Sequence, residues 1–194
     1  MTTLIIPKGF KVTPEQFEQL AFSNAEIRLE LTANGELIVM PPTGGTAGRK
    51  NFELNGQLRD WVKQDGTGVG FDSSTEFTLP SEARRSPDAA WIKLERWVTL
   101  TSEQQDGFPP IAPDFVIELV SPSDLKNQRY EDLQQKMQEY LDNGVRLGWL
   151  IEPKHKTVEI YRLGQSVEIL INPKTLSGEN VLPGFVLDLE PIWS

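Results

Sequence analysis

Two carboxylic acids lie in segments that are otherwise apolar. Glu118 sits in the middle of the apolar run 115–120, and Asp88 opens a second apolar run that continues to residue 92. A buried carboxylate is costly unless it is paired, protonated or bound to a metal. If the two runs form neighbouring strands, the two acids share one pocket, where their mutual repulsion favours a hard divalent cation such as Mg²⁺. Asp88 and Glu118 are therefore predicted to form a metal-binding carboxylate pair.

Both acids also have purely structural explanations. Glu118 could be held by an arginine or keep its proton through a raised pKa, and Asp88 could be a turn residue that follows Pro87. Sequence spacing alone leaves these explanations open.

A lysine with a helical setting is the third candidate. Leu133, Met137 and Tyr140 lie on one apolar face of a predicted helix, and Lys136 lies on the flank of that face. Such a side chain can run its stem along the core and deliver its ammonium group to an acidic pocket, or it can simply reach water.

The composition limits what kind of metal site the chain can build. The chain has 194 residues, no cysteine and a single histidine, His155, which excludes thiolate sites and sites built from several histidines. Any bound metal must be held mainly by oxygen atoms. The net charge of -9 opposes a protein that coats nucleic acid non-specifically, because such binding depends on lysine and arginine.

Length and the absence of certain segments shape the remaining expectations. The length fits one domain that spans residues 1–194. The first residues lack the features of a signal peptide, and no apolar run reaches the ~20 residues that a membrane span needs. We therefore expect a cytoplasmic protein without a membrane partner.

The first third of the sequence predicts a helix and a hairpin. Thr13 is a capping residue, Pro14 stands at the first helical position, and Gln16 follows three residues after the cap. Residues 27–40 then alternate around Asn34-Gly35, a pair that readily takes the positive φ angles of a tight hairpin turn.

The remaining pattern predicts an α+β (α/β-like) fold. The glycine-rich segment 44–48 is interpreted as a flexible connection into a helix that ends near residue 65. A second long helix is predicted over residues 124–142, ending at Asn143-Gly144. Strands are predicted at 75–79, 88–93, 114–121, 146–151, 157–162, 167–171 and 185–189.

The ordered series Pro87-Asp88, Glu118-Leu119-Val120 and Lys136 resembles the PD-(D/E)XK nuclease superfamily, and within it the Uma-type branch of restriction-endonuclease-like proteins. The resemblance covers most of the chain. It implies a restriction-endonuclease-like mixed β-sheet flanked by helices, with an N-terminal β-hairpin. It also implies that Asp88, Glu118 and the backbone carbonyl of Leu119 bind the metal. Glu30 on the hairpin matches an accessory acid of this branch, although a solvent-facing strand residue explains it equally well.

The chain departs from the superfamily pattern in two places. The lysine that should stand two residues after Glu118 is Val120 here, and the branch moves this lysine to the following helix. Lys136 fits that position, and Lys126 is a second candidate. Many members also carry a histidine before the long helix, where this chain has Gly48-Arg49-Lys50.

The resemblance implies an endonuclease that hydrolyses DNA phosphodiester bonds with Mg²⁺, or with Mn²⁺ in its place. A divalent cation offsets charge in the transition state and activates water, while Lys136 would assist the attacking water. Four basic residues are candidate phosphate contacts: Arg49, Lys50, Arg84 and Arg85.

Two other functions stay open. The chain could be a catalytically weak nuclease fold kept as a binding or interaction module, as a homodimer for example. Two carboxylates could also serve glycoside hydrolysis, which requires a carboxyl separation of about 5–10 Å and a sugar-binding cleft.

Overall fold

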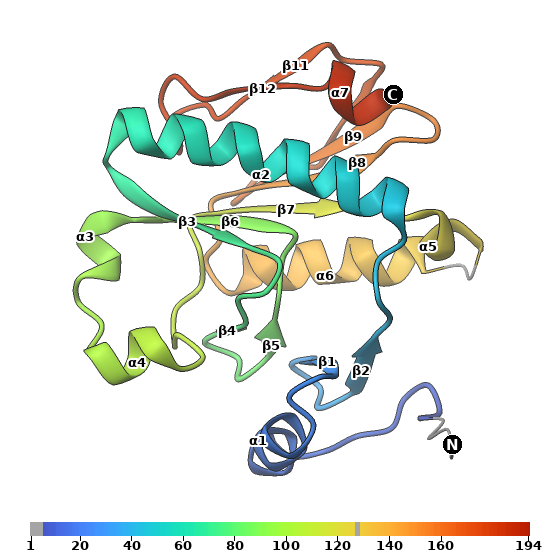
Figure 1. The fold of residues 1–194 in the computed structure, drawn as a ribbon, viewed down its shortest axis with the longest axis vertical. Helices are drawn as coiled ribbons and strands as arrows, with labels where there is room; N and C mark the ends of the chain where they lie inside the picture. Colours follow the sequence, from blue (N-terminus) through green and yellow to red (C-terminus); the bar gives the residue numbers. More distant parts are fainter. Residues whose placement is uncertain (1–5, 127–128) are drawn as a thin grey trace.

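The computed structural model describes residues 6–126 and 129–194, without the side chain of Lys126. Figure 1 shows how the helices and strands are arranged. The helices are α1 (Pro14–Ser23), α2 (Gly45–Asp65), α3 (Leu94–Trp97), α4 (Ser102–Asp106), α5 (Pro122–Lys126), α6 (Tyr130–Asp142) and α7 (Glu190–Trp193). The strands are β1 (Arg28–Leu31), β2 (Leu37–Met40), β3 (Gly68–Asp72), β4 (Phe77–Thr78), β5 (Arg84–Arg85), β6 (Ala89–Lys93), β7 (Phe115–Leu119), β8 (Leu147–Glu152), β9 (Thr157–Arg162), β10 (Glu168–Ile171), β11 (Thr175–Ser177) and β12 (Val186–Asp188).

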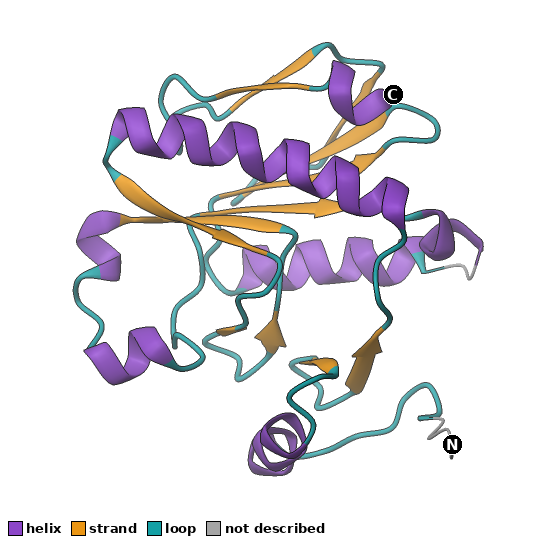
Figure 2. Ribbon diagram, viewed as in Figure 1, coloured by secondary structure: helices purple, strands orange, loops and turns teal. Residues whose placement is uncertain are grey.

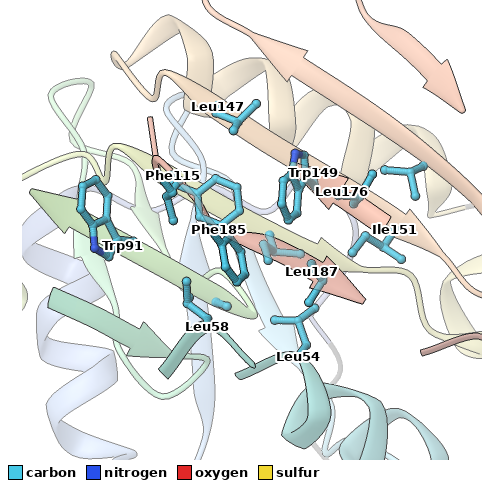
Figure 3. Packing of buried hydrophobic residues seen from close by; sticks show 14 of the residues in the cluster. Leu54, Leu58, Trp91, Phe115, Leu147, Trp149, Ile151, Leu176, Phe185 and Leu187 are labelled. Carbon is cyan, nitrogen blue, oxygen red and sulfur yellow. The ribbon is translucent and has the colours of Figure 1, made fainter. Parts of the chain in front are cut away.

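The main sheet has six strands in the order β10-β9-β8-β7-β6-β3, and only β7 and β8 run parallel. Helix α2 covers one face and α6 covers the other (Figures 1 and 2). Leu54 and Leu58 of α2 pack with Trp149 and Phe185 in the core on the first face (Figure 3). The expected mixed sheet flanked by helices is confirmed.

A second sheet, in the order β2-β1-β5-β4, lies below the main sheet in Figure 1. Its small core consists of Phe17 from α1 and Leu29, Leu31 and Leu37 from the hairpin. Thr13 caps α1 with the predicted reciprocal bonds to Gln16. The predicted hairpin is therefore present, and it has its own support from α1.

Several predicted boundaries are wrong. The turn between β1 and β2 is a longer loop in which Gly35, at φ 80°, is the residue with positive φ. Residues 45–48 form the first turn of α2 and not a flexible connection, because Gly44 serves as its N-cap. The predicted helix over 124–142 is divided into α5 and α6, with residues 127–128 outside the described part.

Some elements were not predicted at all. Strand β3 was missed because Gly68 and Gly70 hide its pattern; Gly68 is needed where the Trp91 ring lies close to its backbone. The short elements α3, α4, α7, β5 and β11 were also missed. No helix within residues 6–126 and 129–194 has both the length and the apolar character needed to cross a membrane.

Candidate active site

The antiparallel pairing of β6 with β7 brings the two predicted acids together. Ala89 lies opposite Ile117, so Asp88, just before β6, lies beside Glu118 in β7. Both acids line one cleft, bordered by the β1–β2 hairpin, the start of α2 and helix α6. Along β7 the side chains alternate, so Glu118 faces α6 together with Val116 and Val120.

Asp88 is held at three points. Its Oδ2 accepts the backbone N–H of Leu119 at 2.8 Å, and its Oδ1 accepts Asn51 Nδ2 at 3.0 Å. Its backbone carbonyl accepts Asn55 Nδ2 at 3.0 Å. Burial raises the pKa of Asp88, although these hydrogen bonds and Lys136 oppose the shift. The side chain is fixed in position yet remains partly accessible from the cleft.

Glu118 is almost fully buried, and one of its oxygens has two donors. Oε1 lies 2.8 Å from Lys136 Nζ and accepts the hydroxyl of Tyr140 at 2.9 Å. Burial raises the pKa of Glu118 to about 7; Lys136 opposes this shift, while Asp88 and Glu30 add to it. Because both donors bind Oε1, the second oxygen of Glu118 is the one available to a cation.

Lys136 lies between two carboxylates. Its Nζ is 2.8 Å from Glu118 Oε1 and 2.8 Å from Glu30 Oε1, and its side chain is 5% exposed. Burial alone would lower the pKa of Lys136, but the two carboxylates outweigh it and raise the pKa above its usual value. The lysine is therefore a largely buried ammonium group at the wall of the cleft.

Glu30 is buried rather than solvent-facing, and three donors surround it. Besides Lys136, its carboxylate accepts the backbone N–H of Ser86 at 3.0 Å and Arg85 Nη1 at 3.0 Å. Burial alone would raise the pKa of Glu30, but Lys136 and Arg85 outweigh it and lower the pKa. Glu30 is thus an ionised partner of Lys136.

Arg85 joins the hairpin to α6. Its guanidinium binds both Glu30 and Glu139, and Glu139 also accepts the backbone N–H of Ala33 at 2.8 Å in the hairpin loop. Lys136 and Glu139 lie one helical turn apart on α6. The helix therefore contacts the hairpin at two points beside the cleft, through Lys136 to Glu30 and through Glu139 to Ala33.

The four candidate phosphate contacts are engaged elsewhere or buried. Arg49 bonds to the carbonyls of Pro191 and Ser194. Arg84 pairs with Glu18, Arg85 binds Glu30 and Glu139, and Lys50 is only 9% exposed and lies outside the cleft lining. Arg85 is the one of these four that lines the cleft, and Arg49 is exposed, so their contact with phosphates stays a prediction.

Two other sequence candidates can be placed only in part. Val120 is 3% exposed in the core beneath α6, so no cationic side chain occupies the usual position. Lys126 ends helix α5, and its side chain lies outside the described part of the structure.

Sequence reasoning missed Asn51, Asn55 and Tyr140. Tyr140 was predicted only as a core residue, although its spacing of four from Lys136 places both hydroxyl and ammonium on one helix face. Asn51 and Asn55 precede Leu54 and Leu58 on the same side of α2. The available signal was that these two asparagines lie on the face of α2 that packs against the sheet, where a polar side chain needs a partner.

The donor set fits a hard divalent cation. Asp88 and Glu118 bring two carboxylates to the cleft, and the Asn51 amide lies beside Asp88. Within the described residues no group of three or more histidine, cysteine or acidic side chains could hold a metal. The buried Oδ1 of Asn51, next to Asp88, has no hydrogen-bond partner among the described residues. Oxygen ligands of this kind suit Mg²⁺ or Mn²⁺ and do not suit soft metals.

Comparisons with known proteins identify a matching family and a similar fold. The model of the family described as "Uma2: Putative restriction endonuclease" matches residues 14–190. The chain resembles the crystal structure of a putative nuclease belonging to DUF820 from Anabaena variabilis ATCC 29413, with a TM-score of 0.77 and 22% identity over 94% of this chain and 97% of that one. The expected restriction-endonuclease-like fold is confirmed. No curated protein matches the chain.

Proposed function

The chain belongs to the Uma2 family, and on this premise we propose that it is a metal-dependent endonuclease that hydrolyses DNA phosphodiester bonds. The observation that supports this proposal best is the meeting of Asp88, Glu118 and Lys136 in one cleft, from three separate segments of the chain. Two carboxylates beside a buried ammonium group are what hydrolysis of a phosphodiester requires from a protein that lacks cysteine and has one histidine.

Asp88 and Glu118 would hold Mg²⁺, or Mn²⁺ in its place, with the backbone carbonyl of Leu119 as a further ligand. When bound, the cation offsets the negative charge that builds up on the phosphate and lowers the pKa of its water. Asp88 is kept in place by the Leu119 N–H, and Glu118 by Lys136 and Tyr140, so both carboxylates are oriented before a cation arrives.

Lys136 would assist the attacking water as a protonated group. Because Glu30 and Glu118 raise its pKa, the ammonium keeps its proton and can orient water or stabilise negative charge, whereas removing a proton from water would require it to be neutral. Glu30 serves in this arrangement as an accessory acid that holds Lys136.

DNA is the proposed substrate. Lys8, Arg28 and Arg129 line the cleft and are exposed, so they are further candidate phosphate contacts. Lys8 also pairs with Asp132 at 3.2 Å, an exposed contact that a phosphate could replace at small cost.

A cleavage assay tests the proposal. Supercoiled, linear and single-stranded DNA are incubated with Mg²⁺ or Mn²⁺ and the wild type, Asp88→Ala, Glu118→Ala or Lys136→Ala. We expect metal-dependent cleavage by the wild type and loss of cleavage in each variant. If the wild type cuts none of the substrates, or the variants cut equally well, this active site is refuted.

The net charge of -9 favours a second candidate, a catalytically weak nuclease fold that acts as a binding module. In that case the wild type would bind DNA or a protein partner without cleaving DNA in Mg²⁺ or Mn²⁺. The same assay, combined with a gel-shift measurement, separates the two candidates.

We also propose that the chain forms a homodimer through β10, the outermost strand of the main sheet. Ile169 and Ile171 are 63% and 80% exposed. The N–H of Asn172 donates to the carbonyl of Lys156, next to β9. Backbone N–H and C=O groups alternate in direction along an antiparallel strand, so those of Ile169 and Ile171 point away from β9, toward the open edge of the sheet. An antiparallel second copy centred on Leu170 would place Ile169 opposite the partner's Ile171, and such open edges pair readily.

Sedimentation velocity tests the dimer. The wild type should sediment as a dimer at about 100 μM, a concentration suited to weak pairs, and Ile169→Lys should sediment as a monomer with an unchanged melting temperature. A monomeric wild type would refute this interface.

A further inference from the structure

Asn51 contacts Asp88 in a single orientation. Its Nδ2 lies 3.0 Å from Asp88 Oδ1. An ionised carboxylate can only accept hydrogen bonds, so the amide nitrogen must face Asp88 and the amide oxygen must point elsewhere.

The amide oxygen is buried and lacks a partner. Asn51 Oδ1 has no hydrogen-bond donor among residues 6–126 and 129–194. A buried oxygen without a donor costs free energy, so a native structure normally supplies a donor, a water molecule or a cation. Asn51 lines the same cleft as Asp88 and Glu118, where such a partner has access.

Asn51 is also held firmly. Asn55, one turn further along α2, donates its Nδ2 to the backbone carbonyls of Asn51 and Asp88 at 2.9 and 3.0 Å. These bonds fix the start of α2 against the residue before β6. The direction of the Asn51 side chain is therefore set before any ligand binds.

The proposed cation needs more oxygens than the two carboxylates supply. Hard divalent cations take six or more oxygen ligands, amide oxygens among them. The third acid of the cleft, Glu30, is engaged by Lys136 and Arg85, and among the described residues no group of three or more acidic, histidine or cysteine side chains could hold a metal. We infer that Asn51 is the third side chain of the cation site, with Oδ1 turned to the cation and Nδ2 holding Asp88. This inference rests on the proposed function.

The competing explanation is that Asn51 only supports Asp88, as Asn55 does. The two explanations differ for Asn51→Asp, which keeps an oxygen but replaces the donor by a second carboxylate. If the oxygen faces the cation, this variant binds the cation at least as tightly as the wild type. If Asn51 only donates to Asp88, the variant is weakened like Asn51→Ala.

Mn²⁺ binding, measured by electron paramagnetic resonance without nucleic acid, provides the test. We expect Asn51→Ala to weaken Mn²⁺ binding about tenfold or more, equivalent to about 1.4 kcal/mol. The control Gln57→Ala, on the same helix but bonded to Asp188 outside the cleft, should stay near the wild type. Asn51→Asp should bind Mn²⁺ at least as tightly as the wild type. Mn²⁺ should also raise the melting temperature of Asn51→Asp more than it raises that of the wild type.

The inference would be overturned if Asn51→Ala binds Mn²⁺ with the affinity of the wild type. It would also be overturned if Asn51→Asp binds Mn²⁺ as weakly as Asn51→Ala. If Asn51→Ala does not fold, Asn51→Asp decides the question. The variant Asp88→Ala distinguishes a failure of the Asn51 inference from a failure of the proposed function. If Asp88→Ala loses Mn²⁺ binding while Asn51→Ala does not, only the role of Asn51 is lost. If Asp88→Ala binds as well as the wild type, the cation site itself is refuted, and the role of Asn51 with it.

Discussion

At the scale of single residues, the site depends on donors that fix its carboxylates, and Tyr140 is the simplest to test. Its hydroxyl donates to Glu118 at 2.9 Å, as the hydroxyl of Tyr161 donates to Glu159, a buried acid outside the cleft. Each Tyr→Phe change removes one buried hydrogen bond and should lower the free energy of unfolding by about 1 kcal/mol.

Only Tyr140→Phe should also affect cleavage, by roughly fivefold, because about 1 kcal/mol of orientation is lost at Glu118. Urea denaturation and plasmid cleavage measure the two effects. Equal cleavage by the two variants would show that Tyr140 has no role beyond packing.

Glu76 provides a pH-dependent prediction away from the cleft. Its Oε1 is buried without a partner among the described residues, and burial, with Glu30 adding, raises the pKa of Glu76 from 4.5 to about 8. The folded state therefore keeps a proton that the unfolded chain loses. This contribution to stability is fully present below pH 4.5 and is lost as the pH rises through about 8.

Glu76→Gln removes the titrating group. The variant should gain stability relative to the wild type as the pH rises from 4.5 to about 8, by about 1.4 kcal/mol for each pH unit. Urea denaturation at pH 5 and pH 9 measures the gain. If the free energies of unfolding of the variant and the wild type differ by the same amount at both pH values, the pKa of Glu76 is not raised.

Residue types made part of the site predictable. Asp88 and Glu118 stand out because an acid in an apolar strand needs a partner, and Lys136 because it flanks a helical stripe. Asn51 and Tyr140 do not stand out, because their roles depend on which helix covers which face of the sheet, and periodicity does not contain that information.

At the scale of elements, α6 lies close to the sheet because β8 has a glycine beneath it. A Cβ at Gly148 would lie 2.5 Å from Met137 Cε and 3.3 Å from Val116 Cγ2. Gly148→Ala should therefore destabilise the protein by about 1 kcal/mol, because the flexible end of Met137 can move aside but Val116 must also give way. It should also reduce cleavage, because Met137 is the neighbour of Lys136.

A double-mutant cycle with Met137→Ala checks the cause of this effect. The smaller side chain makes room, so the cost of Gly148→Ala should shrink in its presence. Gly56→Ala, on α2 with open space around it, is the control and should be neutral or stabilising. Strict additivity in the cycle would contradict the proposed contact.

The same scale shows why some elements were predicted well and others poorly. Helix α1 and strand β9 were predicted closely, since a capping box and a period-two pattern are local signals. The start of α2 was misplaced because Gly45 and Gly48 read as a loop, although open space surrounds both within the helix. The helix starts where the Gly44 carbonyl accepts the Gly48 N–H, a backbone bond that the residue types do not reveal.

At the scale of the whole molecule, charge limits how DNA can bind. The chain carries a net charge of -9, and acids such as Asp124, Asp132 and Asp142 line the cleft beside Lys8 and Arg28. DNA should therefore bind weakly in EDTA and about tenfold or more tightly with Ca²⁺, a cation that offsets the site's charge. Fluorescence anisotropy with a labelled duplex measures the difference. Binding that is equal in EDTA and Ca²⁺ would contradict a cation-dependent cleft.

The most direct test of the proposed active site compares two buried glutamates of the main sheet in Mg²⁺-dependent plasmid cleavage. Glu118→Gln removes a proposed cation ligand, while Glu159→Gln removes a carboxylate bound by Tyr130, Gln134 and Tyr161 outside the cleft. Both changes preserve side-chain shape. We predict that Glu118→Gln abolishes cleavage and that Glu159→Gln retains it in proportion to its folded fraction. Cleavage by Glu118→Gln at the wild-type rate would contradict the proposed role of Glu118 as a cation ligand.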